Sequence, residues 1–280
     1  MAKLKKTTLE IFRKEFLKDG NYTSPPERLA PKRRKSGIFT TMGFTKAVFS
    51  VFPSCAWREF VSGVMTQDEW AHYCFPGFTK AEQYGVPVIV DGWKDRRDYD
   101  GPVVYLANHM STLETLLLPA ITLTFGPLAT VVKDSLSHLP FLRKAAIDMK
   151  LIPIGRKSPK EDLMTIFEKG QEALKNNYSI LIFPQGARSK LFSSKKFSSI
   201  GAKLAEKANV PVVPIAVKTD IQLTRPNGKG WFKDFGTVDT SKDIRFRAGP
   251  LMRGKARDVN VEVFNWIKAQ LDEWGMPTEA

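Results

Sequence analysis

From about residue 80 onward, short apolar runs alternate with segments whose apolar residues recur at helical spacing. The apolar runs predict strands at 86–90, 102–107, 128–132, 151–154, 179–183, 212–217 and 244–248. The helically spaced segments predict helices at 115–123, with a break at Pro119 or beyond, and at 160–176, 200–208 and 259–274. Strands that alternate with helices are typical of an α/β fold, so we expect a mixed, largely parallel sheet flanked by helices. Chemistry is expected near the strand ends of such a sheet.

Composition sets limits on the domain organisation. The chain has 280 residues, of which 42% are hydrophobic and 26% charged, and this balance is typical of a globular protein. We expect three parts: a basic N-terminal arm (1–36), an apolar helical membrane-associating segment (37–80) and an α/β domain (81–280). Residues 1–20 are charged throughout and lack the apolar run of a signal peptide. Two cysteines, Cys55 and Cys74, are too few for a disulfide framework or a zinc site.

Positive charge is concentrated near the N-terminus. The formal net charge is +14, and residues 1–36 carry eleven Lys or Arg against four Asp or Glu. Excess cation favours an anionic partner, either nucleic acid or an acidic membrane surface. We find no nucleic-acid reader motif and therefore expect no nucleic-acid partner. The residues that share one helical face here are Leu9, Phe12 and Phe16, and a basic run follows at 32–35. This segment is either a solvated tail or an arm attracted to anionic lipid headgroups.

An apolar segment adjoins this arm. Residues 36–57 contain a single charge, Lys46, and their length matches a membrane span, although Lys46 and Pro53 disfavour spanning. The apolar residues on one helical face are Phe44, Val48, Val51 and Phe52. We therefore expect an amphipathic segment that lies in the membrane interface, with an ordinary buried helix as the alternative. The predicted location is peripheral or monotopic, at the cytoplasmic face of a membrane.

The first chemical motif is a histidine followed five residues later by a glutamate. The predicted strand 102–107 delivers His109 to a strand-to-helix junction, and Glu114 follows. On a straight helix the two side chains would be about 140° apart, so they meet only if the intervening residues turn. A carboxylate bonded to one imidazole nitrogen leaves the other nitrogen able to accept a proton from a hydroxyl. By itself this motif supports a structural histidine equally well.

The second motif follows the predicted strand 179–183. Gly186 allows a close backbone approach or a positive φ, and Arg188 offers a planar fork suited to a phosphate. Taken alone, this segment is also compatible with a surface turn that carries an incidental arginine. Ser111 raises a competing idea, a serine nucleophile beside His109, which the two-residue spacing disfavours.

Together the motifs are specific. Asn108-His109-x-x-x-x-Glu114, followed about 75 residues later by Phe183-Pro184-x-Gly186-x-Arg188-Ser189, resembles the PlsC-type glycerolipid acyltransferases (lysophosphatidic acid acyltransferases). Lys133 and Pro140, followed by the run Ile-Pro-Ile-Gly-Arg that ends at Arg156, look like the family's second block. The run Val-Pro-Val-Val-Pro-Ile at 210–215, with Pro214, looks like its fourth. The resemblance covers roughly residues 85–250.

The resemblance implies a reaction. His109 corresponds to the general base on the acceptor hydroxyl, and Glu114 to its paired acid, which is usually an aspartate. Arg188 and Gly186 correspond to the phosphate-binding arginine and its glycine, while Gln185, Arg156 and Lys133 correspond to further phosphate contacts. The donor would be acyl-CoA or an acyl-carrier protein, the acceptor most simply 1-acyl-glycerol-3-phosphate, and the product phosphatidic acid. No cofactor and no metal are expected.

Two departures from the family pattern leave the acceptor open. Gln185 and Ala187 stand where the third block usually has Glu and Thr. The alternatives are an acyltransferase for glycerol 3-phosphate or another lysolipid, and a non-catalytic peripheral lipid-binding protein. We also hypothesise that backbone N–H groups at the helix start after His109 stabilise the oxyanion. The sequence leaves the oligomeric state open.

Overall fold

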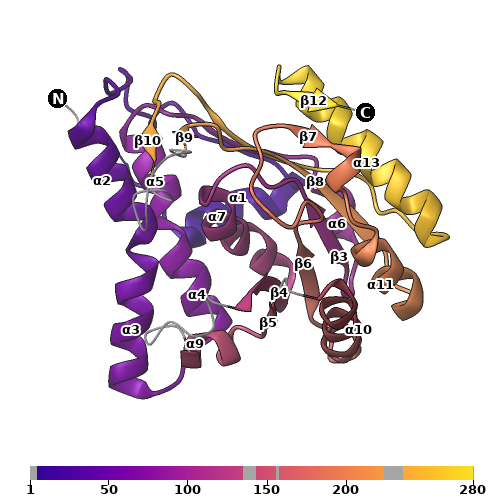
Figure 1. The fold of residues 1–280 in the computed structure, drawn as a ribbon. Coiled ribbons are helices and arrows are strands. Elements are labelled where there is room, and N and C mark those ends of the chain that lie inside the picture. Colours follow the sequence, from indigo (N-terminus) through magenta and orange to yellow (C-terminus); the bar gives the residue numbers. More distant parts are fainter. Residues whose placement is uncertain (1–4, 135–142, 156–157, 224–235, 280) are drawn as a thin grey trace.

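The computed structural model of the protein describes residues 5–134, 143–155, 158–223 and 236–279. Within these residues, an eight-stranded sheet has the order β1-β2-β11-β8-β3-β6-β4-β5 (Figure 1). Its strands are β1 (Tyr22–Thr23), β2 (Val88–Asp91), β3 (Val104–Ala107), β4 (Leu128–Lys133), β5 (Leu151–Ile154), β6 (Ser179–Ile182), β8 (Val212–Lys218) and β11 (Ile244–Ala248). In this sheet β1 is antiparallel to β2 and β11 is antiparallel to β8, while the other neighbours are parallel. The predicted mixed, largely parallel sheet is confirmed.

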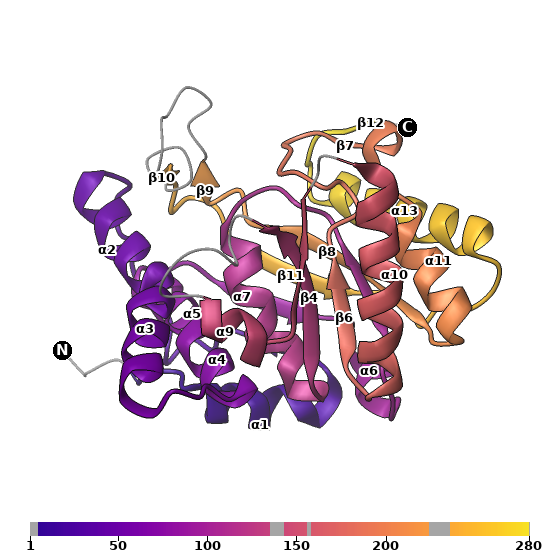
Figure 2. The ribbon, with the colours of Figure 1, turned by 60° about the horizontal axis from the view of Figure 1, so that its bottom comes forward.

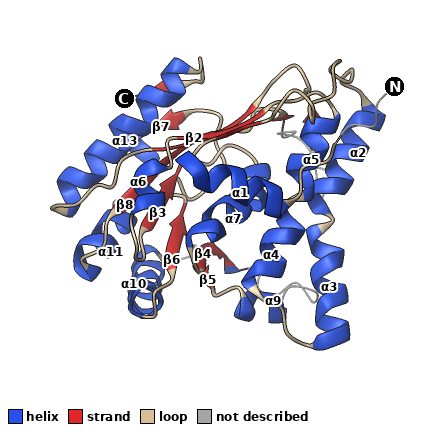
Figure 3. Ribbon diagram, turned by 180° about the vertical axis from the view of Figure 1, so that it is seen from behind, coloured by secondary structure: helices blue, strands red, loops and turns tan. Residues whose placement is uncertain are grey.

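Helices cover both faces of the sheet (Figures 2 and 3). One face packs against α10 (Pro159–Lys175), α11 (Ile200–Ala208) and α13 (Ala256–Glu273). The other face packs against α1 (Leu9–Asp19), α4 (Gln67–Cys74), α5 (Pro76–Gln83) and α7 (Leu113–Thr122). Successive residues of a strand point to opposite faces, so Tyr105 joins the second core and Leu106 the first. Central strands buried on both faces explain the continuous apolar runs in the sequence.

The remaining elements are short or peripheral. They are α2 (Ile38–Phe49), α3 (Val51–Ser62), α6 (Lys94–Asp98), η1 (Leu123–Phe125), α9 (Arg143–Asp148), β7 (Phe192–Ser193), η2 (Ser194–Lys196), β9 (Gln222–Leu223), β10 (Thr237–Val238) and β12 (Thr278–Glu279). β9 pairs with β10, and β7 pairs with β12. The helix predicted at 115–123 continues through the buried Pro119 to Thr122 as α7.

The structure places the N-terminal segment differently from the predicted arm. α1 begins after Thr8, whose hydroxyl accepts a hydrogen bond from the Ile11 N–H, and ends at Gly20, where φ is +77°. Its apolar face, which includes Phe12 and Phe16, is buried in the main core, and β1 extends the sheet. Residues 9–23 are therefore an integral part of the fold, because the face expected to meet solvent or lipid meets the sheet-covering helices instead.

The apolar segment 36–57 also differs from the prediction. It forms two helices, α2 and α3, and Pro53 is accommodated in the first turn of α3, where its missing N–H has no helical partner. Phe44, Val48 and Val51 of the predicted membrane-facing side are buried against the protein. The exposed apolar side chains lie elsewhere on these helices and just after them: Ile38, Phe39, Met42, Trp57, Phe60, Val61 and Val64. In the described residues, no helix is both long enough and apolar enough to span a bilayer.

Candidate active site

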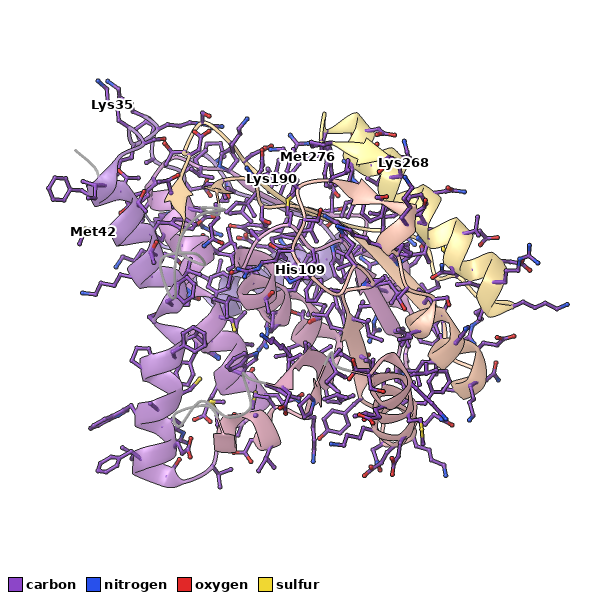
Figure 4. All side chains as sticks on the ribbon, in the orientation of Figure 1. Lys35, Met42, His109, Lys190, Lys268 and Met276 are labelled. Carbon is purple, nitrogen blue, oxygen red and sulfur yellow. The ribbon has the colours of Figure 1, made fainter. Side chains whose placement is uncertain are left out.

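The two sequence motifs meet at the carboxyl ends of adjacent strands. His109 follows β3, the loop 183–189 follows β6, and Thr219 follows β8. β3 lies between β8 and β6 and is parallel to both, so all three loops emerge at one edge of the sheet. Figure 4 shows His109 near the middle of the molecule.

The histidine and the glutamate form a dyad. The His109 Nδ1 lies 2.9 Å from the Glu114 Oε1, because the chain turns after β3 and begins α7 at Leu113. The Glu114 side chain is fully buried, whereas the His109 side chain retains 13% of its surface exposed. The Phe183 ring stacks on the imidazole, with ring centroids 4.4 Å apart. A carboxylate at Nδ1 favours the tautomer that leaves Nε2 as an acceptor.

Hydrogen bonds converge on the Glu114 carboxylate. Its Oε1 accepts from the backbone N–H groups of Met110 and Ser111, both at 2.7 Å. Its Oε2 accepts from the hydroxyls of Ser111 at 2.5 Å and Thr219 at 2.6 Å. Burial alone raises the pKa of Glu114, but the bonds from His109, Ser111 and Thr219 outweigh burial and lower that pKa below its ordinary value. The buried carboxyl is therefore held as an anion.

The same bonds engage several of the N–H groups considered for the oxyanion. The N–H groups of Met110 and Ser111 donate to Glu114, and the His109 N–H donates to the Gln185 Oε1 at 2.8 Å. The Leu113 N–H donates to the Ser111 hydroxyl. These donors at the start of α7 hold the dyad itself and do not point to a reacting carbonyl. The Ser111 hydroxyl is likewise engaged with Glu114, which disfavours a serine nucleophile.

The loop after β6 is fastened to the loop that carries His109. The Ser189 N–H donates to the His109 carbonyl at 2.8 Å, and an Arg188 guanidinium nitrogen donates to the Thr112 hydroxyl at the start of α7. Gly186 has a φ of +67°, which favours glycine, although a Cβ there would meet open space. The glycine is thus required by the turn rather than by a close approach. The Oε1 of Gln185, a residue predicted to contact phosphate, accepts the His109 N–H.

The other predicted site residues have different positions. The Asn108 side chain joins β3 to β8 by donating to the Val217 carbonyl and accepting from the Val217 N–H. Pro184 and Pro214 are buried, and Pro214 lies within β8. Lys133 is exposed at the carboxyl end of β4, which is the same edge of the sheet as His109. Arg156 and Pro140 lie outside the described residues.

Three residues at the site were not found from the sequence. Thr219 bonds Glu114, Phe183 stacks on His109, and Thr112 receives the bond from Arg188. Phe183 belonged to a motif but had no assigned role, and Thr112 lies inside the His-to-Glu spacer. Thr219 carries no sequence signal, because only the order of the strands brings it to the dyad. In the described ranges, no three His, Cys, Asp or Glu side chains form a group that could hold a metal ion.

Comparisons with known proteins agree with this arrangement. A family model described as Acyltransferase matches residues 87–218. A 1-acyl-sn-glycerol-3-phosphate acyltransferase of Pseudomonas aeruginosa is 38% identical over 178 residues, which are 61% of this chain and 65% of that protein. A 1-acyl-sn-glycerol-3-phosphate acyltransferase of Escherichia coli is 29% identical over 50% of this chain and 56% of its own length. The chain thus spans less than two thirds of the length of these relatives.

A solved structure shows the same fold. The crystal structure of the 1-acyl-sn-glycerophosphate acyltransferase PlsC from Thermotoga maritima aligns with a TM-score of 0.61. The alignment covers 85% of this chain and 95% of that chain at 18% identity. The resemblance predicted from the motifs is therefore confirmed: residues 87–218 match the family model described as Acyltransferase, and the fold is that of the PlsC structure.

Proposed function

We propose that the protein is an O-acyltransferase that moves a fatty acyl group from an acyl thioester to the free hydroxyl of a lysophospholipid. The observation that carries this proposal is a His109–Glu114 dyad fastened to a loop that presents Arg188. The relatives from Pseudomonas and Escherichia coli bear the name 1-acyl-sn-glycerol-3-phosphate acyltransferase, so 1-acyl-glycerol-3-phosphate is the acceptor we favour. The donor is acyl-CoA or an acyl-carrier protein.

The proposed reaction needs no covalent intermediate on the enzyme. The His109 Nε2 accepts the proton of the acceptor hydroxyl while that oxygen attacks the thioester carbonyl. The tetrahedral intermediate then collapses, the carbon–sulfur bond breaks, and the imidazolium returns the proton to the departing thiolate. Glu114 holds the imidazole in the required tautomer and stabilises the imidazolium. Alignment of the two lipids at this point supplies much of the rate. The acyl transfer involves no redox step and is assisted by proton transfer, and we expect no cofactor or metal.

Arg188 is the proposed phosphate ligand. Its guanidinium is exposed and lies at the start of α7, where the positive end of the helix dipole also favours an anion. A planar fork suits a phosphate monoester such as that of the favoured acceptor. Lys133, at the same edge of the sheet, would add a second cation.

The membrane is the proposed source of the acceptor. α2 and α3 present large apolar side chains to the exterior, among them Phe39 with 77% and Phe60 with 83% of its surface exposed. In Figure 4, Met42 and Lys35 lie at the outer edge of the molecule, far from its centre. Exposed apolar side chains next to basic ones are typical of a protein that lies on an anionic membrane surface. Peripheral association through α2 and α3 would place the site beside its lipid substrate.

One assay tests the proposal. Purified protein is incubated with palmitoyl-CoA and a panel of lysolipids plus glycerol 3-phosphate, and thiol release is followed. We expect the fastest release with 1-acyl-glycerol-3-phosphate and a loss of about 10²–10⁴-fold in kcat for His109→Ala. His72→Ala is the matched control, because His72 lies on the surface of α4 and bonds Glu10. Thiol release by His109→Ala at the wild-type rate would contradict the mechanism. If the wild-type protein releases no thiol with any acceptor, a non-catalytic lipid-binding protein becomes the favoured alternative.

A further inference from the structure

Thr219 lies beside the dyad although it is far from it in the sequence. It follows the last residue of β8 and is fully buried. Its hydroxyl lies 2.6 Å from the Glu114 Oε2, 105 residues away along the chain, and 2.9 Å from the Ser111 hydroxyl. β8 pairs with β3 in parallel, so the residue just beyond β8 emerges beside the turn that holds His109.

The donors to Glu114 differ in origin. His109, Met110 and Ser111 belong to the same short turn as Glu114 and would move with it. Among the hydrogen bonds of the described residues, the bond from Thr219 is the one that reaches the carboxylate from beyond a different strand. It therefore ties the carboxylate to the rigid centre of the sheet, whereas the other bonds only give the turn its internal shape.

We infer that Thr219 is a positioning residue for acyl transfer, acting on His109 through Glu114. The inference rests on the proposed function. Without the Thr219 hydroxyl, the Glu114 Oε2 keeps one hydroxyl donor, and the carboxyl gains freedom to rotate away from the His109 Nδ1. Since a hydrogen bond to a buried charge is among the stronger ones in proteins, its loss weakens the orientation of the imidazole. A site that must hold its geometry closely is sensitive to such a loss.

The test compares two substitutions that differ in the hydroxyl. Thr219→Val keeps the shape of the side chain and removes the donor, while Thr219→Ser keeps the donor and removes a methyl group. We expect kcat for thiol release to fall about tenfold in Thr219→Val, with the KM for donor and acceptor within about twofold of wild type. Thr219→Ser is expected to retain kcat within about twofold. If Thr219→Val does not fold, Thr219→Ala removes the same hydroxyl with less bulk and replaces it.

A second measurement does not depend on activity. The chain has three histidines, so the nitrogen resonances of His109 are assigned in ¹⁵N-labelled protein by comparison with His109→Ala. In the wild type we expect the neutral ring to carry its proton on Nδ1, and in Thr219→Val we expect this tautomer to be less populated. An unchanged kcat, an unchanged tautomer or a Thr219→Ser variant as slow as Thr219→Val each overturns the role of Thr219. Absence of thiol release by the wild type overturns the proposed function instead, and the tautomer still reports on Thr219.

Discussion

At the scale of single residues, the site is organised around a buried anion. The Glu114 carboxylate has no exposed surface, yet its pKa lies below the ordinary value of 4.5 because hydrogen-bond donors surround it. Burial without such donors would protonate the group. The network that orients His109 is therefore also a part of the stability of the fold.

The lowered pKa of Glu114 predicts a specific dependence of stability on pH. A carboxyl whose pKa is lower in the folded state contributes stability that is complete above the unfolded pKa and is lost as the pH falls through the folded pKa. Glu114→Gln cannot titrate, and it loses charge-assisted bonds, so we expect it to be about 1.5–3 kcal/mol less stable at pH 7. This difference from wild type should shrink as the pH falls below about 4.5. Urea unfolding of both proteins between pH 7 and about pH 4 measures this difference in the free energy of unfolding. A difference that does not change with pH would contradict the proposed role of the Glu114 charge.

Gln185 gives a second prediction at this scale. Its Oε1 accepts the His109 N–H in a buried setting, so Gln185→Leu leaves that donor unsatisfied at nearly constant volume. We expect a loss of about 1–3 kcal/mol in the free energy of unfolding and a lower kcat, because the His109 loop loosens. Gln185→Glu restores an acceptor and is the control, with stability near wild type. If Gln185→Leu has the same free energy of unfolding as the wild type, the hydrogen bond from the His109 N–H does not stabilise the fold.

The residues at the site were predictable to different degrees. His109, Glu114 and Arg188 stand at fixed spacings that match a known pattern, and the structure brings their loops together. The structural role of Gln185 could not be predicted. Its place in the motif indicated a contact with the substrate phosphate, whereas the structure shows that its Oε1 accepts the His109 N–H. Thr219 could not be predicted either, since a lone threonine after a strand has no distinguishing neighbours.

At the scale of secondary-structure elements, strands were predicted well and the N-terminal helices were not. A continuous apolar run bounded by polar residues identifies a buried strand, as at β6 and β8. An amphipathic helix such as α1 looks the same whether its apolar face meets a sheet or a membrane. Composition left a solvated tail or a lipid-attracted arm open for α1, yet tertiary packing placed Phe12 and Phe16 in the core. The surface against which an apolar helix face packs lies elsewhere in the molecule or in the membrane. The local sequence pattern therefore does not identify it.

The docking of the N-terminal segment depends on a buried glutamate. The Glu82 carboxylate at the end of α5 accepts hydrogen bonds from Thr7, Tyr22 and Ser24. Burial, together with this carboxylate, raises the pKa of Tyr22, so its hydroxyl stays a donor. Glu82→Leu would remove the acceptor that three buried hydroxyls share, and we expect a loss of at least about 3 kcal/mol in the free energy of unfolding.

The matched control for this prediction is Glu82→Gln, which keeps one acceptor oxygen and should lose less stability. Limited proteolysis gives a local readout, since a loosened segment is cut within residues 5–24 before the rest of the chain. If Glu82→Leu resists both urea and protease as the wild type does, the hydroxyl cluster does not hold the segment. Deletion of residues 1–24 would remove Phe12 and thereby uncover the core rings of Phe75 and Phe78 that it contacts.

At the scale of the whole molecule, the exposed basic run 32–35 directly precedes α2 and its exposed apolar side chains. The net charge is +14, and α2 and α3 stand at the outer edge of the fold, away from α11 and α13 (Figure 1). Attraction between basic side chains and anionic lipid acts over about 10 Å at 0.1 M salt, while apolar side chains act only on contact. The two effects together predict binding that is oriented, with α2 and α3 against the lipid.

Substitution on α2 and α3 tests this orientation. The combined variant Phe39→Ser, Met42→Ser, Trp57→Ser and Phe60→Ser removes exposed apolar surface without disturbing the buried Phe44, Val48 and Val51. Since a fully buried large apolar side chain contributes about 1.5–3 kcal/mol, even partial insertion of four predicts at least a tenfold loss of affinity. The measurement is sedimentation with vesicles of phosphatidylcholine and phosphatidylglycerol at low and high salt.

Met164 and Val261 provide the matched control, because they are similarly exposed but lie on α10 and α13. Met164→Ser with Val261→Ser should bind vesicles as the wild type does, while all proteins should release thiol from a donor presented with a detergent-dispersed acceptor. Equal vesicle binding by the four-residue variant and the wild type would show that α2 and α3 do not face the lipid. Loss of binding in the control variant would mean that apolar exposure acts without a preferred orientation, and the site would then have no fixed position relative to the membrane.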